Sequence, residues 1–198
     1  MFILGLTGSI GMGKSTTAAM FRAEGIAVHD ADAVVHALYR SQVAAAIEAA
    51  FPGTTRDSVV DRGLLGAKVL GDPAALAWLE AIMHPLVAAS RDAFLDEARK
   101  NGEPLVVLEV PLLFETGGDR KVDAVVLVSA PEAVQKERVS RRVGMTPERL
   151  AVILARQMPD AEKRARAHFI VDTGGEFAAI RRQVSGILRA LAGAKNRL

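Results

Sequence analysis

The sequence contains no cysteine among its 198 residues, and this absence excludes several kinds of site together. Disulfides, thiolate zinc sites and cysteine nucleophiles all need a thiol. A chain without cysteine also fits a reducing compartment. The composition is otherwise that of a globular protein, 50% hydrophobic and 24% charged, and the length fits one domain with room for inserted lobes.

The chain also lacks a strong charge of either sign, a leader-like start and a long apolar run. Its formal net charge is +2, and basic residues cluster only near 138–142 and 162–166, so we expect no nucleic-acid partner. The first residues lack the basic region of a signal peptide. No uninterrupted apolar run approaches the roughly 20 residues that span a bilayer. We therefore expect a cytoplasmic protein without a membrane partner.

Short apolar runs alternate with helical patterns along most of the chain, which predicts an α/β fold. The stretch at about 33–100 is rich in alanine and leucine, mostly helical in pattern and too long for an ordinary crossover, so it predicts an inserted helical lobe. Thr146-Pro147-Glu148 is typical of a helix start. Together the patterns predict a parallel five-stranded sheet between two helical layers, with strands at 2–6, 26–29, 105–110, 123–128 and 168–171 and helices at 15–24, from 131, from 147 and at 177–191.

The segment GLTGSIGMGKST, residues 5–16, contains the full pattern G-x-x-x-x-G-K-[ST] between an expected strand and an expected helix. Its glycines let backbone N–H groups surround phosphate oxygens, and the helix start adds further N–H groups and a positive dipole end. Lys14 suits the β- and γ-phosphates, the Ser15 hydroxyl suits Mg²⁺, and Thr16 can donate to the α-phosphate. The residues predicted to bind the nucleotide here are Gly8, Gly11, Met12, Gly13, Lys14, Ser15 and Thr16.

Two aspartates follow the second expected strand, in Val28-His29-Asp30-Ala31-Asp32. The carboxyl ends of strands in open α/β sheets face the ligand crevice, so a carboxylate there can accept a proton from an attacking hydroxyl. Either aspartate also suits a helix N-cap. We favour Asp32 as the general base and Asp30 as the structural partner.

Glu109 ends the third expected strand and is predicted to hold the water shell of a metal opposite Ser15; a solvated strand-end acid is the alternative. Arg138, Arg141 and Arg142 lie on one side of an expected helix after the fourth strand. Phosphoryl transfer benefits from a cation that arrives on closure, so this helix is predicted to be part of a lid. A solvated basic face is the alternative for the arginines.

These segments, taken in order, resemble those of dephospho-coenzyme A kinases over nearly the whole chain. The phosphate loop is generic, but the D-A-D, H-P and P-L-L-F-E pieces in this order are specific to that family. The matching residues are 5–16, Asp30-Ala31-Asp32 with His36, Val60-Asp61-Arg62 with Leu65, Ile82–Val87, Val110–Glu115, Arg138 with Arg142, Gln157 and 166–172.

The resemblance implies transfer of the ATP γ-phosphoryl group to the 3′-hydroxyl of the dephospho-CoA ribose, the last step of coenzyme A synthesis, with Mg²⁺ as cofactor. It implies that Asp32, Lys14 and Arg142 are catalytic, that Arg138, Arg142 and Asp172 contact ATP, and that Ser15 and, through water, Glu109 hold the metal. The acceptor would be bound by Asp32, His36, Arg62, His84, Pro111, Leu112, Leu113, Phe114 and Glu115.

The implied organisation is one P-loop kinase domain over residues 1–198. It would comprise a nucleotide-binding core (about 1–31, 104–137 and 165–198), a helical acceptor lobe (about 32–103) and a lid (about 138–164). We expect a monomer and leave an oligomer open. His168 departs from the family, which usually has aspartate there, and we expect an effect on local hydrogen bonding. His84-Pro85 also fits a helix start that serves packing alone.

Three other functions compete with this one. A kinase of a nucleoside monophosphate or another small metabolite could use the same core, although the segment 26–36 offers a carboxylate and not an arginine-rich monophosphate site. A GTPase-like switch would need an N-K-x-D segment, yet asparagine occurs only at 101 and 196, and neither is followed by lysine. A non-catalytic nucleotide-binding module leaves Asp32 without a purpose. A preference for ATP over GTP is not predicted.

Overall fold

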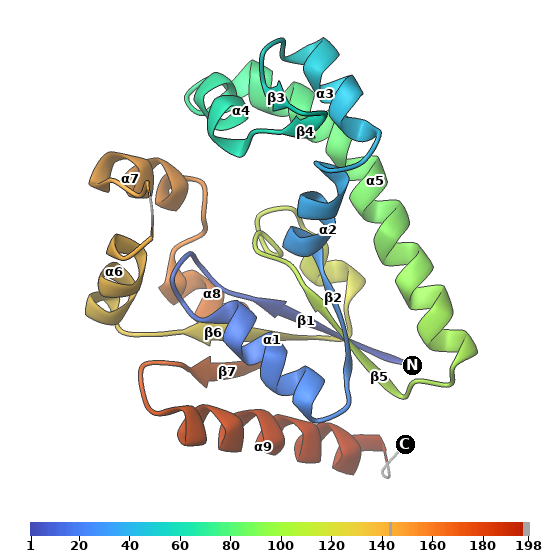
Figure 1. Ribbon diagram of the computed structural model, residues 1–198. Helices are drawn as coiled ribbons and strands as arrows, with labels where there is room; N and C mark the ends of the chain where they lie inside the picture. Colours follow the sequence, from blue (N-terminus) through green and yellow to red (C-terminus); the bar gives the residue numbers. More distant parts are fainter. Residues whose placement is uncertain (143, 196–198) are drawn as a thin grey trace. The chain divides into compact units, whose positions relative to one another are not determined.

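The computed structural model describes residues 1–142 and 144–195, and the chain divides into two compact units (Figure 1). The first unit comprises residues 1–29 and 98–198, and the second comprises residues 30–97. Each unit has its own buried hydrophobic cluster. In the described part of the chain, no helix is both long and apolar enough to cross a membrane.

A five-stranded parallel sheet, in the order β2-β5-β1-β6-β7, runs through the first unit. β1 is central, and its residue Leu6 is in register with Glu109 of β5 and with Val126 of β6. The ends of these strands therefore meet at one edge of the sheet. The bounds are β1 (Phe2–Thr7), β2 (Ala27–Asp30), β5 (Leu105–Glu109), β6 (Ala124–Ser129) and β7 (Phe169–Asp172), which confirms the predicted strands to within two residues at each end.

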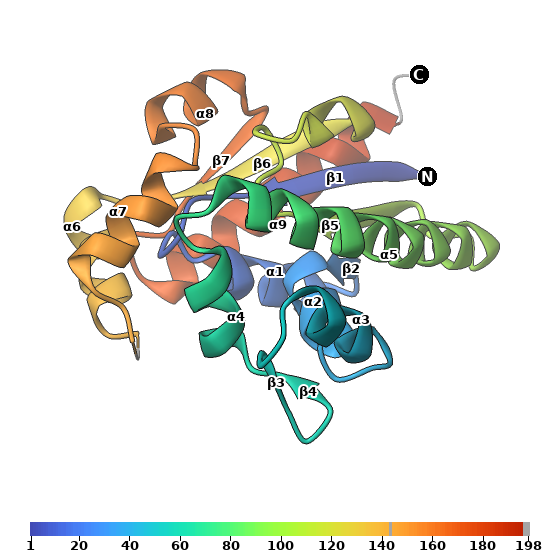
Figure 2. The same cartoon turned by 90° about the horizontal axis from the view of Figure 1, so that it is seen from above.

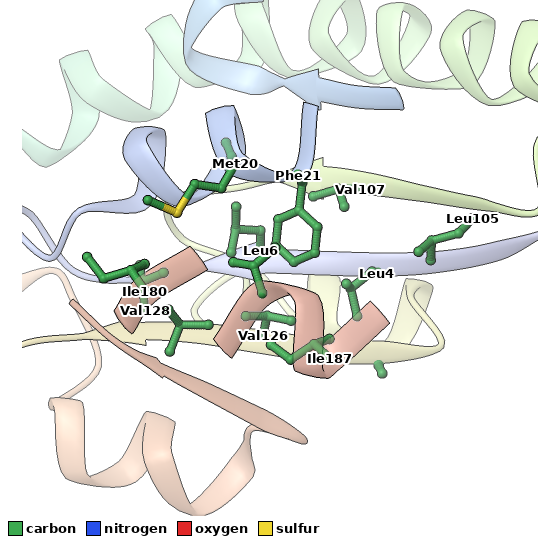
Figure 3. Close-up of a cluster of buried hydrophobic side chains, with 14 of the residues drawn as sticks. Leu4, Leu6, Met20, Phe21, Leu105, Val107, Val126, Val128, Ile180 and Ile187 are labelled. Atoms are coloured by element: carbon green, nitrogen blue, oxygen red, sulfur yellow. The ribbon is translucent and has the colours of Figure 1, made fainter. Parts of the chain in front are cut away.

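Two helices, α1 (Lys14–Ala23) and α9 (Phe177–Lys195), cover one face of this sheet. In Figure 3, Phe21 of α1 and Ile187 of α9 point toward Leu4 and Val126 of the strands. Phe21 is fully buried, and burying a side chain of this size stabilises a fold by roughly 1.5–3 kcal/mol. The apolar residues that the patterns predicted for these two helices thus form the main core.

The opposite face is covered by the segment after β5 and by the chain near α8 (Asp160–Arg166). Leu113 and Phe114 pack there with Val125 of β6. The single-turn helix η1 (Gly118–Lys121) follows in the same segment. The predicted arrangement of a sheet between two covering layers is therefore confirmed.

Between β6 and β7 the described residues form three helices, namely α6 (Glu132–Ser140), α7 (Pro147–Ala155) and α8. Figures 1 and 2 both show α6 and α7 at the end of the sheet where the loop after β1 turns into α1. The predicted start of α7 is confirmed: Thr146 Oγ1 accepts a hydrogen bond from the Arg149 N–H at 3.2 Å, and Pro147 is the first helical residue. The sequence Asp160–Arg166 has no apolar period, so α8 was not predicted.

The second unit is mostly helical, as predicted, but it also contains a β-hairpin that the sequence patterns missed. Strands β3 (Thr55–Arg56) and β4 (Val59–Val60) pair antiparallel around Asp57 and Ser58, whose φ angles of 48° and 63° are left-handed. Two left-handed residues make the turn that two-residue hairpins prefer, and Asn-Gly is its usual signal. Asp-Ser in its place is a weaker signal. The helices are α2 (Ala31–Leu38), α3 (Val43–Ala50), α4 (Arg62–Val69) and α5 (Pro73–Lys100), whose last residues belong to the first unit.

Candidate active site

The glycine-rich loop joins the central strand β1 to α1, and two of its glycines are required by the geometry. A Cβ on Gly8 would lie 2.3 Å from Val128 Cγ2 and 2.7 Å from the Val128 carbonyl oxygen, so the loop passes β6 too closely for any side chain. Gly13 precedes α1 with a φ of 86°, a left-handed conformation that glycine adopts without strain. The glycines thus shape the turn by which the chain enters α1.

The carbonyl groups of three successive loop residues accept hydrogen bonds from other segments of the first unit. Gln135 Nε2 donates to Ile10 O at 2.7 Å, and Thr173 Oγ1 donates to Met12 O at 2.7 Å. Arg138 lies 3.5 Å from Gly11 O. At the start of α1, the first N–H groups have no carbonyl partner within the helix. A segment with engaged carbonyls and N–H groups at a helix start binds anions, and phosphate above all.

Lys14 and Ser15 both approach Glu109, the last residue of β5. Lys14 Nζ lies 2.9 Å from Glu109 Oε1, and Ser15 Oγ lies 3.4 Å from the same oxygen. The second carboxylate oxygen, Oε2, is buried and accepts no hydrogen bond from the described residues, although Arg22 lies 4.0 Å away. The buried Glu109 carboxylate thus has one oxygen that accepts no hydrogen bond from the described residues, and it lies next to a hydroxyl and a lysine. This arrangement suits a site where a cation binds together with an anionic ligand.

The residues around Glu109 are better suited to a Mg²⁺ ion that is also held by a nucleotide and by water than to a metal bound by protein side chains alone. The described residues include no group of three or more His, Cys, Asp and Glu side chains that could hold a metal. Mg²⁺ is usually held by one or two protein oxygens, several waters and the phosphates of its nucleotide. The Ser15 hydroxyl and the Glu109 carboxylate supply oxygens of that kind.

Arg138 was predicted to contact ATP, and the structure shows it engaged with the protein. Its Nη1 lies 3.1 Å from Thr173 Oγ1, and its Nη2 donates to the Thr173 carbonyl at 2.6 Å. Thr173 is buried and follows β7 directly. Arg138 therefore joins α6 to the turn after β7 and to the loop. Arg142 lies beyond the end of α6, and its side chain is exposed.

Asp172, which the resemblance implies contacts ATP, is the last residue of β7, and the turn that follows it is the one implied to lie near adenine. Asp172 Oδ1 accepts the Gly174 N–H at 2.7 Å, and Gln183 of α9 bonds to both the Asp172 N–H and its carbonyl. His168 precedes β7 and exchanges two bonds with Val125: its N–H donates to the Val125 carbonyl, and its Nδ1 accepts the Val125 N–H at 3.2 Å. His168 thus takes part in local hydrogen bonding through both its backbone and its ring.

The segment Pro111–Glu115 lies on the face of the sheet opposite α1. Leu113 and Phe114 are 2% and 5% exposed, so their side chains belong to the core beneath that segment. Pro111 and Leu112 are half-buried. Glu115 Oε1 lies 2.9 Å from Lys163 Nζ and accepts the Met158 N–H at 2.8 Å. Of the five residues in this segment that were predicted to bind the acceptor, three thus have side chains engaged within the first unit.

In the second unit, Asp30 and Asp32 take different places at the start of α2. Asp30 is the N-cap: its Oδ1 accepts the Ala33 N–H at 3.0 Å. The predicted structural role of Asp30 is therefore confirmed, and Asp32 is not the cap. Asp32 and His36 are both exposed and stand four residues apart, which puts them on one side of the helix.

Arg62 begins α4, and Asp61 caps that helix by accepting N–H groups from Gly63 and Leu64 at 2.8 and 3.1 Å. These bonds, and the charge of Arg56 nearby, hold the pKa of Asp61 below its usual value. Arg62 also counteracts the burial that raises the pKa of Tyr39. The cap thus fixes the position of an exposed arginine on the second unit.

His84 is exposed within α5, and Pro85 after it lies inside the helix. The interpretation of His84-Pro85 as a helix start is therefore wrong, because α5 begins at Pro73. A proline inside a helix removes one backbone hydrogen bond, and tertiary packing has to offset that loss. The single sequence signal was ambiguous because proline is common both at helix starts and at kinks.

Sequence reasoning assigned no role to four residues that hold the loop. They are Gln135, Gln157, Lys163 and Thr173, which bond respectively to Ile10 O, the Ile10 N–H, Ser9 Oγ and Met12 O. Each lies more than a hundred residues from its partner in the sequence. Gln157 was among the residues that match the family, but the match gave it no role. The basic cluster near 162–166 includes Lys163, and nothing in its pattern distinguished Lys163 from its neighbours.

Comparisons with known proteins bear on the whole chain. A family model described as dephospho-CoA kinase (CoaE) matches residues 2–179. Curated dephospho-CoA kinases of Mesorhizobium japonicum and Rhodopseudomonas palustris are 59% and 57% identical, covering 98% and 97% of this chain and 98% and 96% of theirs. The crystal structure of TT1252 from Thermus thermophilus superposes with a TM-score of 0.80 at 36% identity, covering 96% of this chain and 97% of that one.

Proposed function

The chain belongs to the dephospho-CoA kinase family and phosphorylates dephospho-CoA with ATP, and we propose that the residues described above carry out this transfer at the 3′-hydroxyl of the ribose. The observation that carries the proposal is the arrangement at the end of β1. There a phosphate-binding loop, Lys14 and Ser15 meet the buried carboxylate of Glu109.

ATP would be held by the loop between β1 and α1. The N–H groups of the loop and of the first turn of α1 bind the phosphates, and Lys14 exchanges Glu109 for the β- and γ-phosphate oxygens. Mg²⁺, held by the Ser15 hydroxyl and through water by Glu109, supplies charge neutralisation at the transferred group. The turn after Asp172 borders the adenine, and Arg138 holds that turn against the loop.

Asp32 is the proposed general base. We infer the position of Asp32 at the site from the order of elements along the chain. Asp32 lies two residues after the end of β2, and ligands of open α/β sheets bind outside the carboxyl ends of the strands. Its carboxylate takes the proton of the 3′-hydroxyl as the oxygen attacks the γ-phosphorus. The bond from the γ-phosphorus to its bridging oxygen breaks, and ADP leaves with both electrons of that bond.

The remaining proposed contacts divide between acceptor and lid. Arg142, exposed beyond α6, reaches the γ-phosphoryl oxygens when ATP and the acceptor are bound, where a cation stabilises the transition state. Leu113 and Phe114 are buried, so they pack in the core and hold the Pro111–Glu115 segment in place. The side chains of this segment that are accessible to the acceptor are those of Pro111 and Leu112. The residues proposed to bind the acceptor from the second unit are Asp32, His36, Arg62 and His84.

The test is a coupled assay of ADP release with ATP and Mg²⁺ across a panel of hydroxyl acceptors. We expect turnover with dephospho-CoA and the appearance of coenzyme A, phosphorylated at the 3′ position, by mass spectrometry and NMR. Turnover with a nucleoside monophosphate and none with dephospho-CoA would refute the assignment. A titration of Mg²⁺ in the same assay tests the cofactor, because activity should be abolished by a chelator and restored by added Mg²⁺.

A further inference from the structure

The side chain of Lys163, in α8, has no exposed surface, and the proposed reaction assigns no role to this residue. It is among the largest fully buried side chains of the described residues. Burying an ammonium group is costly unless it is paired and hydrogen-bonded. A lysine on a surface helix could keep its ammonium group in water, so the burial of Lys163 requires an explanation.

Its ammonium group lies between two segments of the candidate site. Lys163 Nζ lies 2.9 Å from Glu115 Oε1 and donates to Ser9 Oγ at 3.3 Å. Ser9 is 6% exposed, and the Glu115 side chain is 15% exposed, so the contacts are shielded from water. Glu115 Oε2 is buried and accepts no hydrogen bond from the described residues. Glu115 therefore depends on Lys163 for most of its charge compensation.

The position of Ser9 affects the conformation of the phosphate-binding loop. Ser9 follows Gly8, and its carbonyl accepts the Met12 N–H at 3.1 Å. That bond closes a turn at the tip of the loop. A side chain that holds Ser9 thus also holds the turn whose later N–H groups meet the phosphates. The next residue, Ile10, is held at its N–H by Gln157 Oε1 at 3.1 Å.

We propose that Lys163 is a positioning residue for phosphoryl transfer, which fixes the phosphate-binding loop through Ser9 and ties that loop to the Pro111–Glu115 segment through Glu115. In this pair the Lys163 ammonium group contacts the loop at Ser9, and the Glu115 carboxylate belongs to the acceptor segment itself. The inference rests on the proposed function, in which this loop binds ATP.

A structural ion pair without influence on the loop would behave differently from a positioning residue. Loss of such a pair lowers stability but leaves the KM for ATP unchanged in the molecules that fold. A positioning residue that acts through Ser9 raises the KM for ATP, and its effect disappears once the Ser9 contact is gone. A double-mutant cycle measures this dependence.

The cycle uses Ser9→Ala, Lys163→Met and the double variant, with the KM for ATP, the KM for dephospho-CoA and Tm measured for each. Ser9→Ala removes one hydroxyl and is expected to raise the KM for ATP about tenfold, with the KM for dephospho-CoA within about twofold of wild type. In the Lys163→Met background, Ser9→Ala should have no further effect on the KM for ATP. An unchanged KM for ATP in Ser9→Ala, or effects that multiply in the double variant, would overturn the proposal.

Lys163→Met leaves Glu115 buried and unpaired, so its folding is at risk. Where it does not fold, the cycle is run on Lys163→Met combined with Glu115→Gln, which removes both charges, and Ser9→Ala alone still decides the outcome. Lys136→Met is the matched control, since Lys136 pairs with Glu132 at the surface, with both side chains more than 60% exposed. Its kinetic constants and Tm should match wild type. Turnover of the wild type with dephospho-CoA tests the proposed function separately.

Discussion

Lys14 Nζ and Glu109 Oε1 lie 2.9 Å apart, in a pair whose carboxylate is 1% exposed. The two residues are positioned by adjacent parallel strands: β1 leads through the loop to Lys14, the first residue of α1, and β5 ends at Glu109. The pair places a negative charge at the phosphate site before any nucleotide binds. In the function we propose, ATP displaces Glu109 from Lys14, and Glu109 would then face the Mg²⁺ that accompanies ATP.

Glu109→Gln tests this exchange. The substitution keeps the size of the side chain and removes the charge that we propose orients the metal's water shell. Loss of such an outer-shell partner typically weakens metal affinity about 10- to 100-fold, so the Mg²⁺ concentration that supports half-maximal turnover should rise by about that factor. Binding of ATP without metal should not weaken, because Lys14 loses its competing partner.

The measurements are turnover against Mg²⁺ concentration and calorimetric binding of ATP in the presence of a chelator. Glu137→Gln is the control, since Glu137 pairs with Arg141 on the exposed side of α6. A Mg²⁺ midpoint equal to that of wild type would remove Glu109 from the metal site.

Asp32→Asn tests the general base. The amide cannot accept the proton of the ribose hydroxyl, so kcat should fall by about 10²- to 10⁴-fold while ATP still binds. The assay is initial-rate kinetics together with equilibrium binding of ATP. Asp72→Asn is the matched control in the same unit, because Asp72 caps α5 through the Ala74 and Ala75 N–H groups and asparagine caps equally well. A normal kcat in Asp32→Asn would leave this residue with a local role only.

Arg142→Ala tests the lid. A cation that contacts the γ-phosphoryl oxygens mainly in the transition state contributes to kcat more than to ATP affinity. We expect kcat to fall at least about tenfold more than the Kd for ATP rises, by rapid kinetics and fluorescence titration. Arg141→Ala removes the same charge from a surface pair with Glu137 and should be near wild type. Equal losses in kcat and affinity would make Arg142 a ground-state ligand.

Glu48→Gln tests the stability of the second unit. Its carboxylate accepts hydrogen bonds from the N–H groups of Gly53 and Thr54, just before β3, and of Thr55, the first residue of β3. The bond from the Gly53 N–H, followed by the bond from the Thr55 hydroxyl, is the main cause that lowers the pKa of Glu48 from its usual 4.5. A depressed folded-state pKa stabilises the fold fully above the unfolded value and ceases to do so as pH falls through the folded value.

The difference in Tm between wild type and Glu48→Gln should therefore be constant between about pH 6 and 8 and shrink below about pH 4.5. Thermal denaturation across that range measures it. Glu97→Gln, an exposed acid of α5, controls for the loss of one negative charge. A difference that did not change with pH would mean that the bonds to Glu48 do not depend on its charge.

The sequence was informative wherever a local pattern and its physical cause coincide. The phosphate-binding loop, the capped starts of α2 and α7, and the five strands of the sheet all follow from residues within a few positions of one another. The β3–β4 hairpin and α8 were missed for the same reason, since Asp57-Ser58 is a weak turn signal and Asp160–Arg166 has no apolar face. Arg138 was placed on the correct segment, but its bonds to Thr173 could not be inferred from α6 alone.

The sequence by itself determined that this protein binds a nucleotide's phosphates and, through the segments that resemble its family, which reaction it catalyses. Only the tertiary structure decided what holds the loop: Gln135, Arg138, Gln157, Lys163 and Thr173 converge on it from distant parts of the chain. The reason is physical. A loop's own residues set its backbone conformation, whereas the partners of its polar groups are brought together by packing of the sheet and its covering layers.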